Sequence, residues 1–414
     1  MQENTIQLPH LALFRRLNAH LQQHPEQGVQ LRYADEDAFE CSTCAQCCRF
    51  PWAVYIDRAY YDRQSQPLAE MMQRPVEELF KLTPPGQPAH APYAILQKQP
   101  DSDRCIFLDE DNLCRIHKTL GPEAKPSTCN EYPRLTLQKS RVYRSSSMMQ
   151  SCFTVARQEP QDWPIQYGFY PLAPQTPHPL FRLTARAAMD RHAFLLWIGS
   201  ALDVLMNARN MTDTFALLFE LARRWSSQRL PVLTLEQAEA YTGQPFPAVK
   251  ALELEKYRQL LQGLREQLLP QSQLKPFLHW LEDFAAGEDM SVRWTPEEQA
   301  LLLRYQKQYF QRAFLMQAYV EEGFANVLQQ LYLWSSFALL QQLLTRFYVE
   351  QDASSHLKLE HLAQATNVMH ALLVQNPRNI EHWGISRWPD EICFVKIHEL
   401  VRALKGTQAP DPNK

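Results

Sequence analysis

The sequence predicts a mainly α-helical protein, with an irregular cysteine-rich, metal-binding N-terminal domain followed by an all-α helical bundle. Eight of the nine cysteines fall between Cys41 and Cys152, glycine supplies only 11 of 414 residues, and apolar residues recur at helical spacing through the second half. At 414 residues the chain is longer than the roughly 250–300 residues at which one hydrophobic core stops growing. Two domains are therefore expected.

Composition excludes several classes of protein. The glycines are never closer than 20 residues apart, so no glycine-rich phosphate loop of the dinucleotide or P-loop type is present. A count of 42 Lys+Arg against 45 Asp+Glu argues against nucleic acid as a partner. The longest apolar run, 194–206, is shorter than the ~20 residues of a membrane span, and residues 1–10 lack a secretory signal. A cytoplasmic location is expected.

The first half is expected to contain one helix and the cysteine domain. Residues 1–35 are predicted to supply an N-terminal helix that packs on the next domain, because apolar residues recur there every three or four positions. Residues 36–159 form the predicted metal-cluster domain, whose short strand candidates at 53–56 and 141–143 do not suggest a large sheet. Six prolines between 160 and 179 predict an extended linker over 160–180.

Residues 181–414 form the predicted helical domain. Thr295 and Pro296 precede two glutamates, which predicts a helix N-terminus with a capping box. The stretch 331–348 is apolar around most of its circumference, as expected of a buried central helix. One amphipathic face is formed by Tyr257, Leu260, Leu261, Leu264 and Leu268.

The clustered cysteines predict metal ligation. A chain without an export signal stays in a reducing compartment where thiols persist, so disulfides are not expected. The first block has the spacing C-x2-C-x2-C-C, in which adjacent Cys47 and Cys48 project in different directions, so further ligands from elsewhere are expected. Cys393 is expected to be a buried apolar residue. The predicted ligands are Cys41, Cys44, Cys47, Cys48, Cys105, Cys114, Cys129 and Cys152.

The residues leave the identity of the metal open. Zinc would take four thiolates, or three thiolates with His117 as the imidazole, although His117 also fits a plain surface position on a helix. An iron–sulfur cluster would take four cysteines and leave four for a second site or for shielding. The first block lacks the C-x3-C-x2-C spacing of radical enzymes that use S-adenosylmethionine, which argues against that chemistry.

The cysteine blocks carry a resemblance. C-x2-C-x2-C-C, L-C-x-I-H-K-x-L-G and K-P-x-x-C-x-x-Y-P-R, over residues 39–152, resemble the zinc- or iron-chelating cysteine-cluster family. Because a long helical half follows these cysteine blocks, the chain is similar to the flagellin lysine-N-methylases of flagellated enterobacteria. The resemblance implies methyl transfer from S-adenosylmethionine to surface lysines of flagellin, with an iron–sulfur cluster, expected as 4Fe–4S, as cofactor. It identifies no catalytic residue.

Lysine methylation sets a further requirement, because at pH 7 only about 1 lysine in 2,500 is neutral and nucleophilic. A base or a desolvating pocket is needed, and a cationic sulfonium donor favours aromatic faces. The weak candidates for a base are Glu131, Tyr132 and Asp109, and those for donor binding are Trp52, Tyr55, Tyr132, Tyr143, Arg134, Lys139, Arg141 and Arg144. Each also fits a surface, capping or core position.

Two other functions fit the same residues. One is a non-catalytic zinc- or iron-chelating or metal-delivery protein that uses the helical half as a docking surface. The other is an electron-transfer protein, which would require a coloured cluster that is reduced reversibly.

Overall fold

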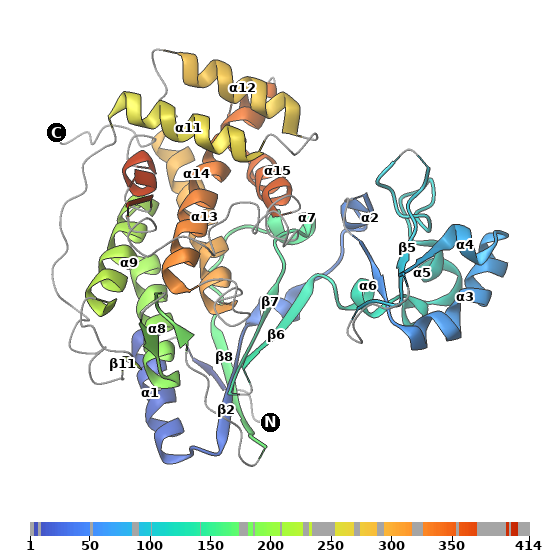
Figure 1. Cartoon of the computed structure of the whole chain (residues 1–414), viewed down its shortest axis with the longest axis horizontal. Coiled ribbons are helices and arrows are strands. Elements are labelled where there is room, and N and C mark those ends of the chain that lie inside the picture. The colour runs from blue at the N-terminus through green and yellow to red at the C-terminus, as the bar shows by residue number, and fades with distance from the viewer. Residues whose placement is uncertain are drawn as a thin grey trace.

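The structure is a computed structural model. It describes residues 4–6, 10–49, 53–84, 91–100, 102–140, 142–173, 181–184, 187–207, 209–226, 232–233, 253–268, 274–287, 294–316, 326–352, 356–370, 395–396 and 399–404. In these ranges a large helical lobe and a small cysteine-bearing lobe are joined by a sheet (Figure 1). The mainly α prediction is confirmed.

The joining sheet has five strands and was not predicted. In it β2 pairs in parallel with β7 and antiparallel with β8, so segments far apart in sequence lie side by side. The strand order is β1 (Asn4–Ile6), β8 (Ile165–Pro171), β2 (Gln27–Tyr33), β7 (Tyr143–Met148) and β6 (Arg134–Ser140).

Strand β8 lies inside the segment for which the sequence predicts a proline-rich linker. The segment is extended there, as expected, but its backbone pairs with β2 along its whole length and with β1 over three residues. Pro164 precedes the strand and Pro171 ends it, so neither proline interrupts the run of β-forming residues between them. The two prolines lie at the ends of a strand. The composition of the segment did not reveal that the residues between them pair with neighbouring strands.

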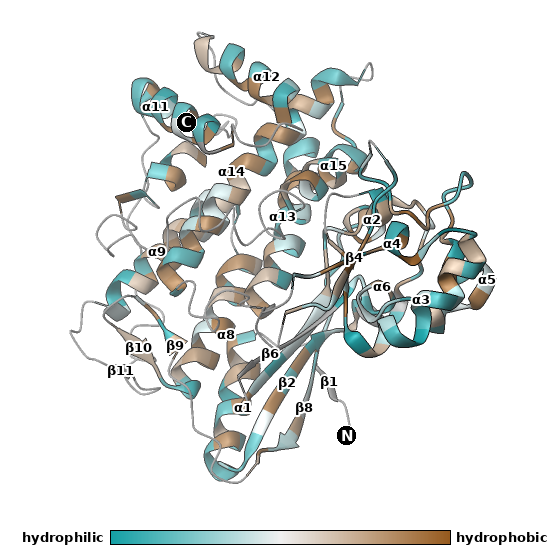
Figure 2. Ribbon diagram, turned by 45° about the vertical axis from the view of Figure 1, so that its right-hand side comes forward, coloured by the Kyte–Doolittle hydropathy of each residue, from teal (hydrophilic) through white to brown (hydrophobic). Residues whose placement is uncertain are grey.

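The large lobe has an apolar core. Helix α14 is buried along almost its whole length, as its apolar sequence predicts, and α13 begins at Pro296 with Thr295 and Glu298 in a reciprocal capping box. Figure 2 shows outer helix α11 more hydrophilic than α8. The helices are α1 (His10–Gln23), α8 (Arg191–Asn207), α9 (Met211–Ser226), α11 (Leu254–Leu268), α12 (Lys275–Ala286), α13 (Pro296–Met316), α14 (Val327–Gln351) and α15 (Leu359–Met369), with short strands β9 (Phe181–Arg182), β10 (Ala188–Met189) and β11 (Val232–Leu233).

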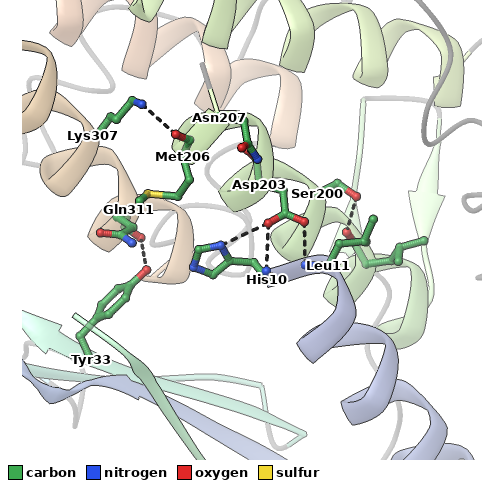
Figure 3. Close-up of polar contacts among 10 residues, drawn as sticks. His10, Leu11, Tyr33, Ser200, Asp203, Met206, Asn207, Lys307 and Gln311 are labelled. Atoms are coloured by element: carbon green, nitrogen blue, oxygen red, sulfur yellow. Dashed lines mark hydrogen bonds and ion pairs between the residues drawn. The ribbon is translucent and has the colours of Figure 1, made fainter. Parts of the chain in front are cut away.

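Helix α1 packs on α8, which follows it by more than 160 residues. A Cβ at Gly199 would lie 2.8 Å from the Cβ of Phe14, so the contact needs glycine there. Asp203 of α8 accepts the backbone N–H groups of His10 and Leu11, each at 2.9 Å, and closes the first turn of α1 (Figure 3). The N-terminal helix is therefore part of the large lobe.

The small lobe surrounds its own core of aliphatic and aromatic residues, which includes Ile56, Leu68, Phe80 and Phe107. Within the described ranges, no helix in either lobe is long and apolar enough to cross a membrane. The elements from β2 to β8 that belong to this lobe or border it are η1 (Ala34–Ala38), α2 (Gln46–Arg49), β3 (Tyr55–Ile56), α3 (Arg58–Met72), α4 (Val76–Leu79), β4 (Phe80–Leu82), β5 (Ala94–Leu96), α5 (Arg115–Leu120), η2 (Pro122–Ala124), α6 (Ser127–Glu131) and α7 (Phe153–Ala156).

Candidate metal centre

The loop that carries the first cysteines has an unusual backbone. Thr43 and Ala45, on either side of Cys44, have φ of 52° and 57°, in the left-handed region that side-chain-bearing residues rarely adopt. The N–H of Thr43 points back to Cys41 Sγ at 3.4 Å. Such strain collects at functional sites, and N–H donors to sulfur favour the thiolate that a metal requires.

Four thiols gather within the small lobe, and we call them the lobe thiols. The N–H of Cys105 donates to the carbonyl of Cys48 at 2.7 Å, and Cys105, Cys114 and Cys129 all pack against the small-lobe core. Burial raises the pKa of Cys129, and the neighbouring thiols of Cys105, Cys48 and Cys114 raise it further. The lobe thiols are Cys48, Cys105, Cys114 and Cys129.

The other four thiols lie where the small lobe meets the large one, and we call them the junction thiols. Thr154 connects two of their segments, because its hydroxyl lies 2.6 Å from Ser42 Oγ and 4.0 Å from Cys44 Sγ. Burial raises the pKa of Cys152, and nearby Cys44 raises it further. The junction thiols are Cys44, Cys47 and Cys152, together with Cys41, which we assign to them only by its place in the same loop, three residues before Cys44.

The two groups meet at Cys47 and Cys48, whose Sγ atoms are 3.9 Å apart. The hydrogen bond between them lowers the pKa of Cys48 and, together with burial, raises that of Cys47. Apart from Cys48, the thiols that raise the pKa of Cys47 are Cys152 and Cys44, both junction thiols.

The donor set fits a thiophilic metal. Backbone N–H groups two or three residues along the chain hydrogen-bond to the sulfurs of Cys105, Cys114 and Cys152, as Thr43 does to Cys41. Such hydrogen bonds tune metal-bound thiolates. The charges of Lys98 and Lys125 lower the pKa of Cys48, and these two cations offset the excess negative charge of four thiolates around a divalent ion.

The thiols are grouped but not yet at bonding distance. Among the residues described, no three potential ligands converge closely enough to hold a metal ion as they stand. Metal–sulfur bonds of ~2.3 Å would require the side chains in each group to move inward.

Of the predicted candidates for a base, Tyr132 is the one that lies beside the thiols. Its hydroxyl is 3.2 Å from Ser151 Oγ, and burial, followed by the nearby thiols of Cys152, Cys47 and Cys44, raises its pKa well above the usual value. Glu131 is exposed at the end of α6. Asp109 accepts the N–H of Leu113 and pairs with Lys118, so it closes a turn.

The predicted donor-binding residues are scattered. Tyr143 is buried in the large-lobe core, where its hydroxyl donates to the carbonyl of Leu315 at 2.5 Å. Arg144 lies over the ring of Tyr170, and Tyr55 is exposed. Arg134 lies over the ring of Phe39, the side chain of Lys139 in β6 is not described, and Trp52 and Arg141 lie outside the described residues. Of the other two predictions, the alternative metal ligand His117 is exposed on α5, and Cys393, expected to be a buried apolar residue, lies outside the described residues.

Sequence reasoning missed the residues that connect the junction thiols to the large lobe. The side-chain amide of Asn367 in α15 donates to the carbonyl of Ser151 at 2.5 Å. Arg157 pairs with Glu360 of the same helix at 2.9 Å. Nothing in the local sequence marks α15 as a neighbour of Cys152, because the two are more than 200 residues apart in the chain.

Comparison with known proteins finds similarity over part of the chain. Residues 40–152 match the CxxCxxCC family, described as a putative zinc- or iron-chelating domain. The flagellar biosynthetic protein FliU of Salmonella muenchen is 29% identical over 102 residues, which cover 23% of this chain and 56% of that protein. The lysine-N-methylase of Salmonella typhimurium is 57% identical over 30 residues, which cover 7% of this chain and 8% of that protein.

A third relative comes from an archaeon and has no function in its name. An uncharacterized protein of Methanocaldococcus jannaschii is 32% identical over 96 residues, which cover 23% of this chain and 29% of that protein. The chain thus spans between about a twelfth and just over half of the relatives' lengths. No solved structure matches.

Proposed function

We propose that the chain is an S-adenosylmethionine-dependent protein-lysine N-methyltransferase that acts on flagellin in the cytoplasm, with a metal centre held by the clustered cysteines. The observation that carries the proposal is the gathering of the C-x2-C-x2-C-C thiols with four downstream thiols, in a segment that matches a chelating domain. The short match to a lysine-N-methylase supplies the reaction. An iron–sulfur cluster, expected as 4Fe–4S, is the preferred metal group, and zinc is the alternative.

The chain's own residues have defined tasks in this proposal. The thiolates would hold the metal, which when bound would supply a centre of electron transfer as an iron–sulfur cluster, or would fix the positions of the cysteine segments as zinc. Tyr132, whose raised pKa keeps it protonated at neutral pH, would serve as a hydrogen-bonding group at the junction and not as a base. The methyl group would pass from the sulfonium to a neutral lysine nitrogen. The sulfonium would thereby become a neutral thioether, and the methylated lysine nitrogen would later release a proton to water.

Transfer of label tests the activity. Metal-replete protein incubated with methyl-labelled S-adenosylmethionine and flagellin is expected to place label on lysine side chains, measured by peptide mass spectrometry. The Cys393→Ser variant, altered outside the cluster, should retain the activity. Absence of labelled lysine with metal-replete protein would reject the proposal.

The second function is metal chelation or delivery without catalysis. It is favoured by the extent of the family match, which covers the chelating domain and leaves the large lobe unmatched. Calorimetric titration separates the two functions. Uptake of S-adenosylmethionine supports the methyltransferase, whereas tight Zn²⁺ binding without any uptake of S-adenosylmethionine supports the chelating protein.

A further inference from the structure

We propose that the eight thiols form two separate metal centres, one within the small lobe and one at its junction with the large lobe. The inference deepens the proposed function and rests on the metal binding that it includes. The lobe centre would use Cys48, Cys105, Cys114 and Cys129, and the junction centre would use Cys41, Cys44, Cys47 and Cys152.

The lobe thiols are held by contacts that stay inside the small lobe. Cys105 is tied to the backbone of Cys48, Leu108 forms an isolated bridge with Cys114, and the N–H of Cys129 donates to the carbonyl of Pro126 at 2.9 Å. Three of the four thiols also contact the same apolar core. An ion bound here would crosslink segments of one lobe and would act as a structural centre.

The junction thiols are held from two sides. Ser42 and Thr154 connect the first cysteine loop with the segment of Cys152. That segment is in turn attached to α15 of the large lobe through the Ser151–Asn367 hydrogen bond and the Arg157–Glu360 ion pair. An ion bound here would therefore connect the cysteine loop to a segment anchored on the helical lobe.

The neighbours of Cys47 and Cys48 explain why the motif ends in two adjacent cysteines. Cys48 affects the pKa of three other lobe thiols, whereas Cys47 interacts with Cys152 and Cys44. Successive residues of the short helix α2 project in different directions, so one turn supplies a ligand to each group. The 3.9 Å separation of the two sulfurs also fits a single shared ion, which is the rival arrangement.

The two groups differ in their most exposed member. The junction thiols range from exposed Cys41 to buried Cys152, whereas each of the lobe thiols is partly covered. Structural metal sites are closed, and reactive sites keep an accessible position. The junction centre is accordingly the one that faces substrate in the proposed function.

Metal stoichiometry tests the division. Full-length protein is stripped with a chelator under anaerobic, reducing conditions and titrated with Zn²⁺, and bound metal is measured by mass spectrometry. We expect about two equivalents per chain, since structural zinc takes four thiolates. Cys129→Ser and Cys152→Ser are each expected to retain about one equivalent, and Cys393→Ser about two.

Alkylation identifies the thiols that remain protected. In Zn²⁺-loaded Cys129→Ser, the junction thiols should resist iodoacetamide while Cys48, Cys105 and Cys114 react, and Cys152→Ser should show the converse. One equivalent in the parent protein, lost completely in both variants, would overturn the two-centre inference while metal binding stood. No bound Zn²⁺ in the parent protein would overturn both the inference and the metal centre of the proposed function.

Discussion

Both lobes have aromatic side chains in their interiors, but their cores differ in extent. The core of the large lobe spans many helices and includes Phe181 and Phe194, stacked with ring centroids 3.8 Å apart, whereas the small lobe closes over a much shorter set of apolar residues with three cysteines packed against it. The large lobe buries enough apolar surface to be stable by packing. The small lobe depends on loops, short helices and thiols. The comparison leads to the expectation that the small lobe, unlike the large one, relies on the metal of the proposed function to fix its structure.

Removal of the metal is expected to have the largest effect. Structural zinc sites contribute about 10 kcal/mol to folding, so chelation under reducing conditions should unfold the small lobe. Hydrogen exchange should show amides of β3, β4 and β5 losing protection, while those of α14 keep theirs. Unchanged protection in the small lobe after complete metal removal would contradict the comparison.

Truncation of a core aromatic should affect Zn²⁺ binding in the small lobe but not in the large lobe. Phe194→Ala leaves a cavity beside Phe181 and should lower the free energy of unfolding of the large lobe by about 4 kcal/mol, without a change in bound Zn²⁺. The matched variant Phe107→Ala, in the small-lobe core, should weaken Zn²⁺ binding. Denaturant unfolding and metal titration of both variants provide the measurement, and equal loss of metal in both would refute the distinction.

Asp35 and Arg312 form an ion pair where the chain leaves the sheet for the small lobe. This pair tests how the stability of the large lobe depends on a contact next to the small one. Both side chains are buried, with Arg312 Nη2 2.6 Å from Asp35 Oδ2. Asp35→Asn leaves a buried guanidinium without its counter-charge and should cost about 3 kcal/mol, measured by urea unfolding. The double variant Asp35→Leu/Arg312→Met should recover part of that loss; a double variant less stable than Asp35→Asn would show that the charges themselves stabilise the fold.

Acid should affect the large lobe through Asp203. Burial by itself raises the pKa of Asp203, but hydrogen bonds from His10 and Leu11 outweigh it and hold the pKa below its usual value. The stabilisation is thus present above the unfolded pKa of about 3.9 and is lost as pH falls through the lower folded value. Between about pH 6 and pH 2, the free energy of unfolding measured with urea should fall by about 1 kcal/mol less in Asp203→Asn than in the parent protein. Equal pH dependence in the two proteins would contradict this role.

Local patterns predicted the helices well, because the residues that decide them are neighbours in the chain. The capping residues Thr295 and Glu298 and the apolar run of α14 are examples. The five-stranded sheet escaped prediction because β2 pairs with β7 and β8, which follow it by more than 100 residues. Pairing partners at that distance leave no periodic signal in one sequence.

The candidate site was predictable in its residue types and not in its grouping. Four close cysteines and four later ones indicated a metal site, but the spacing alone could not assign Cys47 and Cys48 to different groups. The proposed grouping rests on tertiary contacts, among them those of Thr154 and Asn367, which have no motif of their own. Tyr143 looked like a donor-binding residue because it lies near the cysteines in sequence, yet its strand directs it into the large-lobe core.

The packing of α1 on α8 has a consequence for biosynthesis. The ribosome adds about 5–20 residues per second, so the apolar face of α1 emerges roughly 10 s or more before the glycine against which Phe14 packs. The cysteine segment, Cys41 to Cys152, is translated within that interval and is complete before the glycine emerges, so its thiols can capture metal while the large lobe is still being translated. The nascent N-terminal helix meanwhile needs shielding from neighbouring chains until its partner arrives.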